Sequence, residues 1–278
     1  LELNTLPSSA VIIGAGAVAL EFASLWNAAG CEVTLLIRKD RVLSTWERRA
    51  SMTLTRELKR RGVNVIARTA VDRVDTGANL GATVHYRQGD SDEDRTAYGE
   101  VVLAAIGRVP NTDADWFRSS GLKLDERGYV TVDGYGRTNL DGVWALGDIT
   151  PGHALAHRAF EQGITIAEKI AGADPKPVLD DTVPQVVFSF PEAASVGLTL
   201  DQAKAREDVV EPKETAYPML SNARMLMSGE GGSMTVVSGA FANNPDMQVV
   251  LGVHIVSPIA SDLICLLYTS PSPRDMRR

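Results

Sequence analysis

The chain has 278 residues, of which 44% are hydrophobic, so it can form one or two domains with sizeable cores. Its 28 Lys and Arg residues against 35 Asp and Glu residues give a net charge of −7, which argues against nucleic acid or an anionic membrane surface as a partner. No apolar run in the sequence reaches the length of a membrane span. Cys31 and Cys265 lie far apart without metal-site spacing, so we interpret Cys31 as a packed residue.

The first predicted elements are a strand, a glycine turn, a helix and a second strand. Residues 10–13 form a short apolar run, which is typical of a strand buried on both faces, and residues 32–37 return as a parallel strand. Gly14 and Gly16 permit a tight turn and a close approach of the backbone to a pyrophosphate. The helix N-terminus offers free N–H groups to the phosphates. The positions that begin this helix are Ala17, Val18 and Ala19.

Apolar side chains recur at helical spacing along the predicted helix, at Val18, Phe22, Leu25 and Ala29. Gly30 is placed to end the helix. A strand, a glycine loop, a helix and a strand in this order predict a dinucleotide site, whereas the glycine pattern alone would be weak evidence.

The second strand ends in an unusual residue for such a site. An NAD site usually has Asp or Glu there, about twenty residues past the glycines, to bind the ribose hydroxyls of the adenosine. Here the position falls on Ile37, and Arg38 and Lys39 follow. A guanidinium suits the 2′-phosphate of NADP, so we predict a site that accepts NADP(H) at least as well as NAD(H). The alternative is that Arg38 is a solvated strand end in an NAD site.

The following segment predicts a β-meander in place of the second crossover helix. A charged amphipathic helix is expected over residues 48–61, and a solvated hairpin turn over 89–95. His85 lies in the meander and is expected to be solvated. The last strand of the segment leads into Gly107 and Arg108. The strands are expected over residues 63–66, 71–74, 84–87 and 101–106.

A second candidate site follows a predicted strand over residues 143–146. Gly147 leaves room for a cofactor, and Asp148 can accept hydrogen bonds from hydroxyl groups. A helix expected over residues 155–170 offers N–H groups to negative charge near Ala156 and His157. His153 and His157 could pair as metal ligands, but no third ligand is nearby, and no metal site is predicted. His254 lies in an apolar run and is expected to be packed or at a dimer interface.

Four motifs occur in an order that resembles the class I pyridine nucleotide-disulphide oxidoreductases. They are the Gly14-x-Gly-x-x-Ala19 loop with Glu21 and the segments 105–111, 138–148 and 183–199. Residues 155–163 are more similar to the dihydrolipoyl dehydrogenase branch of that family than to glutathione reductase. The resemblance implies an α/β fold: an NAD(P) domain over 1–112, the returning part of an FAD domain over 113–180, and a truncated α+β dimerisation domain over 181–264.

The resemblance also implies site residues. Glu21 matches a glutamate that supports the nicotinamide and flavin region, and Gly107 and Arg108 belong to the NAD(P) site. The residues implied to bind FAD are Gly147, Asp148, Leu155, Ala156 and His157. The partners implied are a small-molecule or lipoyl-domain disulfide or dithiol and a second copy of the chain. We expect a cytoplasmic protein, although the true N-terminus is not seen.

The family's redox Cys-x4-Cys pair and His-Glu pair have no match in the chain, so no catalytic residue is assigned within it. We interpret residues 265–278 as a non-native tail derived from a sequencing adaptor. A segment of this kind is expected to hold FAD weakly, to lack lipoamide reductase activity alone and to associate poorly. Three functions stay open: a dihydrolipoyl dehydrogenase, an NADPH-dependent reductase of glutathione- or mycothione-type disulfides, and a nucleotide-binding module without redox activity.

Overall fold

The computed structural model describes residues 3–76 and 81–269, with side chains 224, 228 and 266–269 excepted. The chain divides into two compact units: Leu1–Gly107 with Pro184–Arg278, and Arg108–Val183. The domain limits expected from the sequence stay predictions. Residues 265–269, which we assign to the non-native tail, continue a helix, and residues 270–278 lie outside the described residues.

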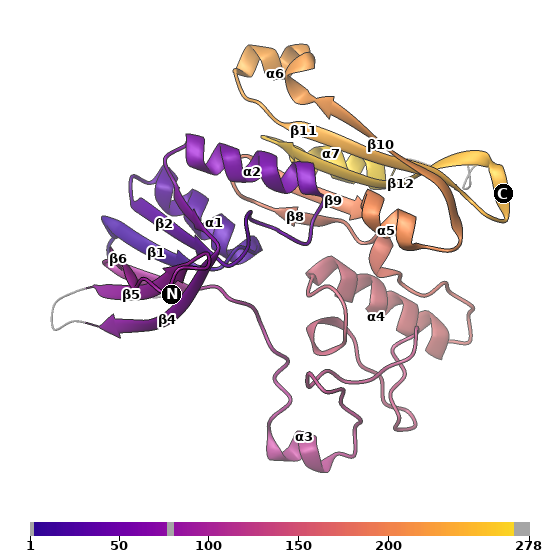
Figure 1. Ribbon diagram of the computed structural model, residues 1–278. Coiled ribbons are helices and arrows are strands. Elements are labelled where there is room, and N and C mark those ends of the chain that lie inside the picture. The colour runs from indigo at the N-terminus through magenta and orange to yellow at the C-terminus, as the bar shows by residue number, and fades with distance from the viewer. Residues whose placement is uncertain (1–2, 77–80, 270–278) are drawn as a thin grey trace. The chain divides into compact units, whose positions relative to one another are not determined.

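A four-stranded parallel sheet forms the first half of the larger unit (Figure 1). Its order is β3-β2-β1-β7, and the strands are apolar because helices and a second sheet cover both faces. The predicted class, with a Rossmann-like sheet and a meander, is confirmed. The strands are β1 (Ser9–Ile13), β2 (Glu32–Ile37), β3 (Asn64–Ala67) and β7 (Val101–Ala104).

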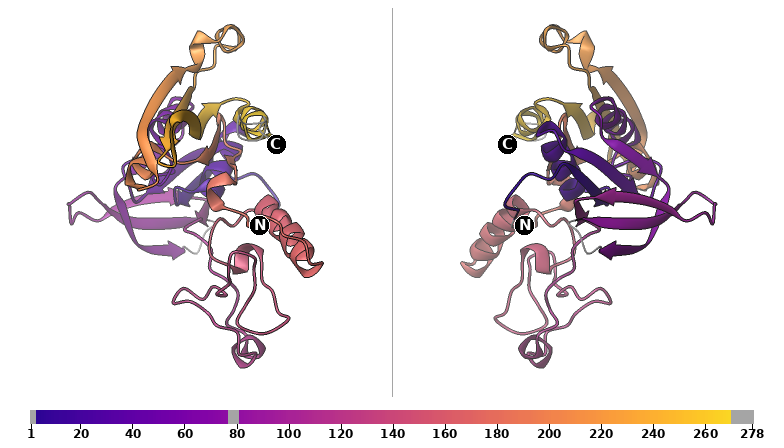
Figure 2. Two further views of the ribbon diagram at one scale, coloured as in Figure 1. Left: turned by 90° about the vertical axis from the view of Figure 1, so that its right-hand side faces the viewer. Right: turned by 90° about the vertical axis from the view of Figure 1, so that its left-hand side faces the viewer.

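The two faces of this sheet have different covers. Helices α1 (Ala17–Ala28) and α2 (Arg48–Arg60) share a core with one face. On the other face the meander buries Val84 and Tyr86 against Val11 of β1. Figure 2 shows the meander strands, in purple, projecting from the unit. They are β4 (Thr69–Thr76), β5 (Ala82–Gln88) and β6 (Arg95–Gly99).

The predicted helix after the glycine loop is present, but its apolar stripe is not its buried face. Val18 is 40% and Leu25 is 61% exposed. The buried side chains are instead Ala19, Leu20, Ala23, Ser24 and Trp26. Ala19, Ala23 and Ser24 let the helix backbone approach the strands closely, while Leu20 and Trp26 fill the core beside them. Periodicity alone does not separate this buried face from the neighbouring apolar stripe.

His85 was expected to be solvated, and that expectation is wrong. Its side chain is only 14% exposed and lies between two carboxylates, with Nε2 3.1 Å from Asp75 Oδ2 and Nδ1 3.0 Å from Asp94 Oδ2. The Arg73 guanidinium lies 2.9 Å from Nδ1. These charged side chains of the meander cover the ring, so alternation with polar neighbours does not by itself expose a side chain.

The second half of the larger unit is a five-stranded antiparallel sheet in the order β10-β11-β12-β9-β8. Helix α7 (Ala260–Thr269), seen end-on in yellow in Figure 2, packs on β9 and β12. The strands are β8 (Gln185–Val187), β9 (Glu192–Gly197), β10 (Val209–Pro218), β11 (Ser233–Phe241) and β12 (Asn244–Ser257). The short helices are α5 (Leu200–Ala205), η3 (Met219–Ser221) and α6 (Ala223–Ser228).

The two sheets of the larger unit share one hydrophobic core. Val187, Ala193 and Val256 pack in the same buried cluster as the strands and helices of the parallel sheet. Helix α2 lies beside β11 and β12, as Figure 1 shows. Burying apolar surface from both segments in one core makes them a single compact unit, although about eighty residues separate them in the chain.

A buried histidine lies within the antiparallel sheet. His254 is 1% exposed, and its Nδ1 lies 2.7 Å from Ser195 Oγ. Its Nε2 lies 3.2 Å from the carbonyl oxygen of Leu198. A carbonyl can only accept, so Nε2 carries the proton and Nδ1 accepts from the serine hydroxyl. Burial lowers the pKa of His254, while the Leu198 hydrogen bond and the Glu47 charge oppose that shift.

We expect the free energy of unfolding to fall as the pH drops below about 6.5, the ordinary histidine pKa. Below that pH the unfolded chain binds a proton at His254, whereas the folded chain does not, because folding lowers the pKa of His254. His254→Gln keeps an N–H donor and an acceptor without titrating. Urea unfolding between pH 7 and 5 should show a steeper loss in the wild type than in this variant; equal slopes would contradict the assignment.

The smaller unit contains few regular elements. The strand expected over residues 143–146 is wrong: only an isolated bridge joins Trp144 to Arg137. Val143 and Leu146 are 39% and 38% exposed, since no second strand in the described part of this unit extends the ladder. The elements of this unit are α3 (Asp115–Ser119), η1 (Gly147–Ile149), α4 (Ala156–Ile170) and η2 (Asp180–Thr182).

Candidate functional site

The two glycines of the loop at the carboxyl end of β1 have different surroundings. Gly14 has φ 139°, and a Cβ on it would meet the carbonyl oxygen of Ala105. Gly16 has φ −90°, and a Cβ there would find nothing within 4 Å. Gly14 therefore lets neighbouring strands close together, whereas Gly16 faces open space in front of α1.

The N-terminus of α1 is available to a ligand. No side chain caps it within the described residues, and Gly16 itself is the N-cap. The first-turn residues Ala17, Val18 and Ala19 present backbone N–H groups at the positive end of the helix dipole. The open space, the uncapped helix and the small residues fit a pyrophosphate group.

The end of β2 presents positive charge. Ile37 is fully buried, while Arg38 and Lys39 are exposed, and neither side chain pairs with another described residue. The nearby carboxylate is already engaged, because Asp40 Oδ1 lies 2.8 Å from Arg41 Nη1. Two exposed cations therefore follow the position of the usual acid, as the sequence predicts, and their role stays a prediction.

Sequence reasoning missed a third cation at this edge. The register pairs Ile37 with Ala67, so Arg68 follows β3 where Arg38 follows β2. Arg68 is exposed, and its backbone N–H donates to the carbonyl oxygen of Lys39 at 3.0 Å. The sequence predicts that a strand ends at residue 66, close to Arg68. It does not show that this strand pairs with the strand that ends at Ile37, which is what brings Arg68 to the same edge.

Glu21 holds a distant segment against α1. Its Oε1 accepts a hydrogen bond from the backbone N–H of Phe188 at 3.0 Å. One turn further on, Ser24 Oγ accepts from the N–H of Phe190 at 3.1 Å. The partner of Glu21 in this structure is therefore a backbone N–H from the beginning of the antiparallel sheet.

Gly107 lies at the same sheet edge as Gly14. Strands β1 and β7 pair in a register that places Ile13 beside Ala104, and the Ala105 N–H donates to the carbonyl oxygen of Ile13 at 2.8 Å. Gly107 is exposed with φ 137°. Arg108 is exposed and begins the smaller unit.

The second candidate site lies in the smaller unit, around the beginning of α4. Gly147 is buried with φ 73°, and its N–H donates to Gln162 Oε1 at 2.8 Å. Asp148 is exposed on the 3-10 turn. The helix begins at Ala156 with Leu155 as N-cap, no side chain in the described part of the chain caps it, and Ala156 and His157 are exposed in its first turn. This arrangement fits a group with hydroxyls and negative charge.

A buried arginine beside these residues was not predicted. The Arg158 side chain is 7% exposed, and its Nε donates to Asp180 Oδ1 at 2.6 Å. Its Nη2 donates to the carbonyl oxygen of Pro151 at 2.7 Å, while Nη1 finds no partner among the described residues. Arg158 thereby ties α4 to the loop that follows Asp148.

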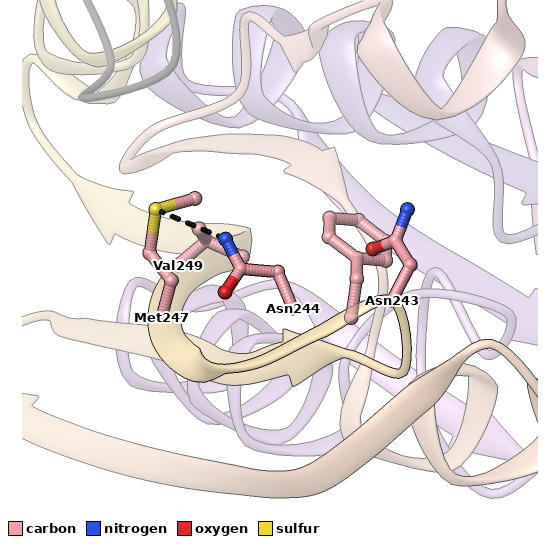
Figure 3. Close-up of a pocket in the computed structure, with 5 residues that line it drawn as sticks. Asn243, Asn244, Met247 and Val249 are labelled. Atoms are coloured by element: carbon pink, nitrogen blue, oxygen red, sulfur yellow. Dashed lines mark hydrogen bonds between the residues drawn. The ribbon is translucent and has the colours of Figure 1, made fainter.

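Two other features carry no chemistry of their own. A hollow of about 290 Å³ at the β11–β12 hairpin, shown in Figure 3, has Met247 Sδ near the Asn244 amide and no titratable side chain in its lining. Cys31 is buried, and burial raises the pKa of its thiol, which disfavours the reactive thiolate. Among the residues the structure describes, no cluster of His, Cys, Asp or Glu could hold a metal ion, and no helix could cross a membrane.

Comparison with known protein families gives two matches. Residues 1–163 match a family model described as pyridine nucleotide-disulphide oxidoreductase. Residues 183–268 match the dimerisation domain of the same family.

Two bacterial proteins similar to this chain are both named dihydrolipoyl dehydrogenase. A dihydrolipoyl dehydrogenase from Cupriavidus necator is 36% identical over 266 residues, which are 95% of this chain and 54% of that protein. One from Geobacillus stearothermophilus is 36% identical over 273 residues, with 96% and 55% covered. The chain thus spans about half the length of these relatives.

Solved structures share the fold. LpdA from Mycobacterium tuberculosis has a TM-score of 0.83 at 29% identity, covering 99% of this chain and 57% of its own. The Cu(II) complex of a cysteine-to-serine mutant of the flavoprotein disulfide reductase RclA from Escherichia coli has a TM-score of 0.81 at 24% identity, covering 96% of this chain and 58% of its own, and supports the fold alone.

Proposed function

The chain belongs to the pyridine nucleotide-disulphide oxidoreductases, and we propose on this basis that its enzyme passes electrons between a dithiol and a nicotinamide cofactor through FAD. The relatives named dihydrolipoyl dehydrogenase favour a dihydrolipoyl substrate. The observation that carries the proposal is the open loop at Gly16 in front of an uncapped α1. A pyrophosphate can approach the backbone there without a steric barrier.

In this proposal the larger unit binds the nicotinamide dinucleotide. Gly14 and Gly16 would hold its pyrophosphate, whose oxygens would accept hydrogen bonds from the backbone N–H groups of the first turn of α1. Glu21 acts as a supporting residue, because it fixes the segment at Phe188 against that helix. The remaining residues assigned to this cofactor are Ala17, Val18, Ala19, Arg38, Lys39, Gly107 and Arg108.

The smaller unit provides part of an FAD site in this proposal. FAD supplies a two-electron carrier between the dithiol and the nicotinamide. Asp148 accepts hydrogen bonds from the ribityl hydroxyls, and the N-terminus of α4 stabilises negative charge on the ring. Gly147 keeps the turn before Asp148 in a conformation that suits glycine. The other residues assigned here are Leu155, Ala156 and His157.

A second candidate function is an NADPH-dependent disulfide reductase. Arg38 and Lys39 favour it, since they are exposed, pair with no other described residue and directly follow the position of the acid expected at an NAD site. A nucleotide-binding module without redox activity is the third candidate. Assembly as a homodimer through the matched dimerisation domain and a cytoplasmic location are part of the proposal.

The assay that separates these functions uses FAD-loaded protein expressed from the whole gene. We expect reduction of NAD⁺ or NADP⁺ with dihydrolipoamide as donor. Turnover of glutathione or mycothiol disulfide with NADPH, and none with dihydrolipoamide, would favour the second function. Nucleotide binding without turnover of any dithiol or disulfide would favour the third.

A further inference from the structure

Three exposed basic residues lie at one edge of the parallel sheet. Arg38 and Lys39 follow β2, and Arg68 follows β3, with Ile37 and Ala67 in register just before them. None of the three side chains pairs with another described residue. Three unpaired like charges at one strand edge repel one another, so this edge favours a ligand that carries negative charge.

Arg68 occupies a backbone conformation that does not suit it. Its φ is 58°, in the left-handed region that favours Gly, Asn or Asp. Both of its backbone groups are fixed: its N–H donates to Lys39 O at 3.0 Å, and its carbonyl accepts from Gly89 N at 2.8 Å. The fold requires this conformation, but it does not require an arginine there. A function of the side chain would account for the residue.

We propose that Arg68 is a specificity residue that, with Arg38 and Lys39, binds the phosphate on the adenosine 2′-position of NADP(H). The inference rests on the proposed dinucleotide site. With the pyrophosphate at Gly14 and Gly16, the adenosine ribose lies outside the carboxyl end of β2. A guanidinium binds a phosphate through two parallel hydrogen bonds, and Lys39 adds a point charge.

The charge at this edge also selects against NAD(H). With NAD(H) the three cations stay unneutralised, and Asp40, the carboxylate next to Lys39 in the chain, pairs with Arg41. The Arg41 guanidinium is fixed as well, since its Nη2 donates to Ser44 O at 3.1 Å. Arg68 therefore contributes to discrimination rather than to binding of the common part of the two cofactors.

The test compares two probes that differ only by the 2′-phosphate: adenosine 2′,5′-bisphosphate and adenosine 5′-monophosphate. Asn tolerates the left-handed conformation, so Arg68→Asn removes the charge without new backbone strain. Arg68→Lys keeps the charge, and Arg56→Gln removes an exposed arginine of α2 as a matched control. Calorimetric titration is done at low salt, because exposed charges are screened.

We expect the wild type to bind the bisphosphate at least about tenfold more tightly than the monophosphate, a factor typical of one charge-assisted contact. Arg68→Asn should lose most of that ratio while its monophosphate affinity stays constant. Arg68→Lys should retain part of the ratio, and Arg56→Gln all of it. An unchanged ratio in Arg68→Asn overturns the role of Arg68. Failure of the wild type to bind either probe would instead contradict the dinucleotide site itself.

Discussion

Replacing Gly14 with Ala is expected to destabilise the fold by about 3 kcal/mol or more, which is in the range of severe backbone effects. The φ of 139° is outside the range of an L-residue, and the new methyl group would meet the backbone carbonyl of Ala105. A backbone oxygen cannot rotate away as a flexible side chain can. Strand β7 would have to separate from β1. Urea unfolding of the variant and the wild type measures the loss.

Gly30→Ala is the matched control for this effect. Gly30 also has a positive φ, 93°, but a Cβ there meets nothing within 4 Å. Gly30→Ala should lower the free energy of unfolding by only about 1 kcal/mol, which is the strain of alanine at a positive φ without a steric collision. Equal losses in the two variants would show that contact with Ala105 contributes nothing.

Replacing Gly16 with Ala should leave stability nearly unchanged and abolish dinucleotide binding. Its φ of −90° suits any residue, and no atom lies within 4 Å of the added Cβ. Stability should change by less than about 0.5 kcal/mol. The methyl group would occupy the space that a pyrophosphate needs, so affinity should fall about a hundredfold, or about 2.7 kcal/mol.

Thermal unfolding and titration with NADPH, done on the same preparation, check both halves of this prediction. Leu25→Ala is a suitable control, because it shortens a 61% exposed side chain on a later turn of the same helix and leaves the first-turn backbone N–H groups in place. If Gly16→Ala bound NADPH as tightly as the wild type, the ligand would not lie against this loop.

The local half of the fold was readable from the sequence. A glycine loop between an apolar run and an amphipathic segment predicts β1, α1 and β2 because each signal depends on neighbouring residues. The family predicted from four ordered motifs is confirmed by matches over residues 1–163 and 183–268. The strand over 143–146 was wrong because an apolar run forms a strand only where a neighbour pairs with it.

What the sequence did not show depends on contacts between distant segments. Glu21 and Phe188 are 167 positions apart, and their hydrogen bond exists because the antiparallel sheet shares a core with α1. The proximity of Arg68 to Lys39 depends on the pairing of β2 with β3. Neither contact produces a periodic pattern in the sequence. A side chain that lies between two distant segments therefore looks like an ordinary surface residue when the sequence alone is read.

In our proposal the Gly14–Gly16 loop and the cations after β2 form one dinucleotide site that accepts NADP(H) at least as well as NAD(H). The most direct measurement is calorimetric titration of the wild type and Arg38→Ala with NADPH and with NADH. We expect NADPH to bind at least as tightly as NADH in the wild type, and Arg38→Ala to weaken NADPH about tenfold while NADH changes little. Tighter binding of NADH, unaffected by Arg38→Ala, would contradict this account.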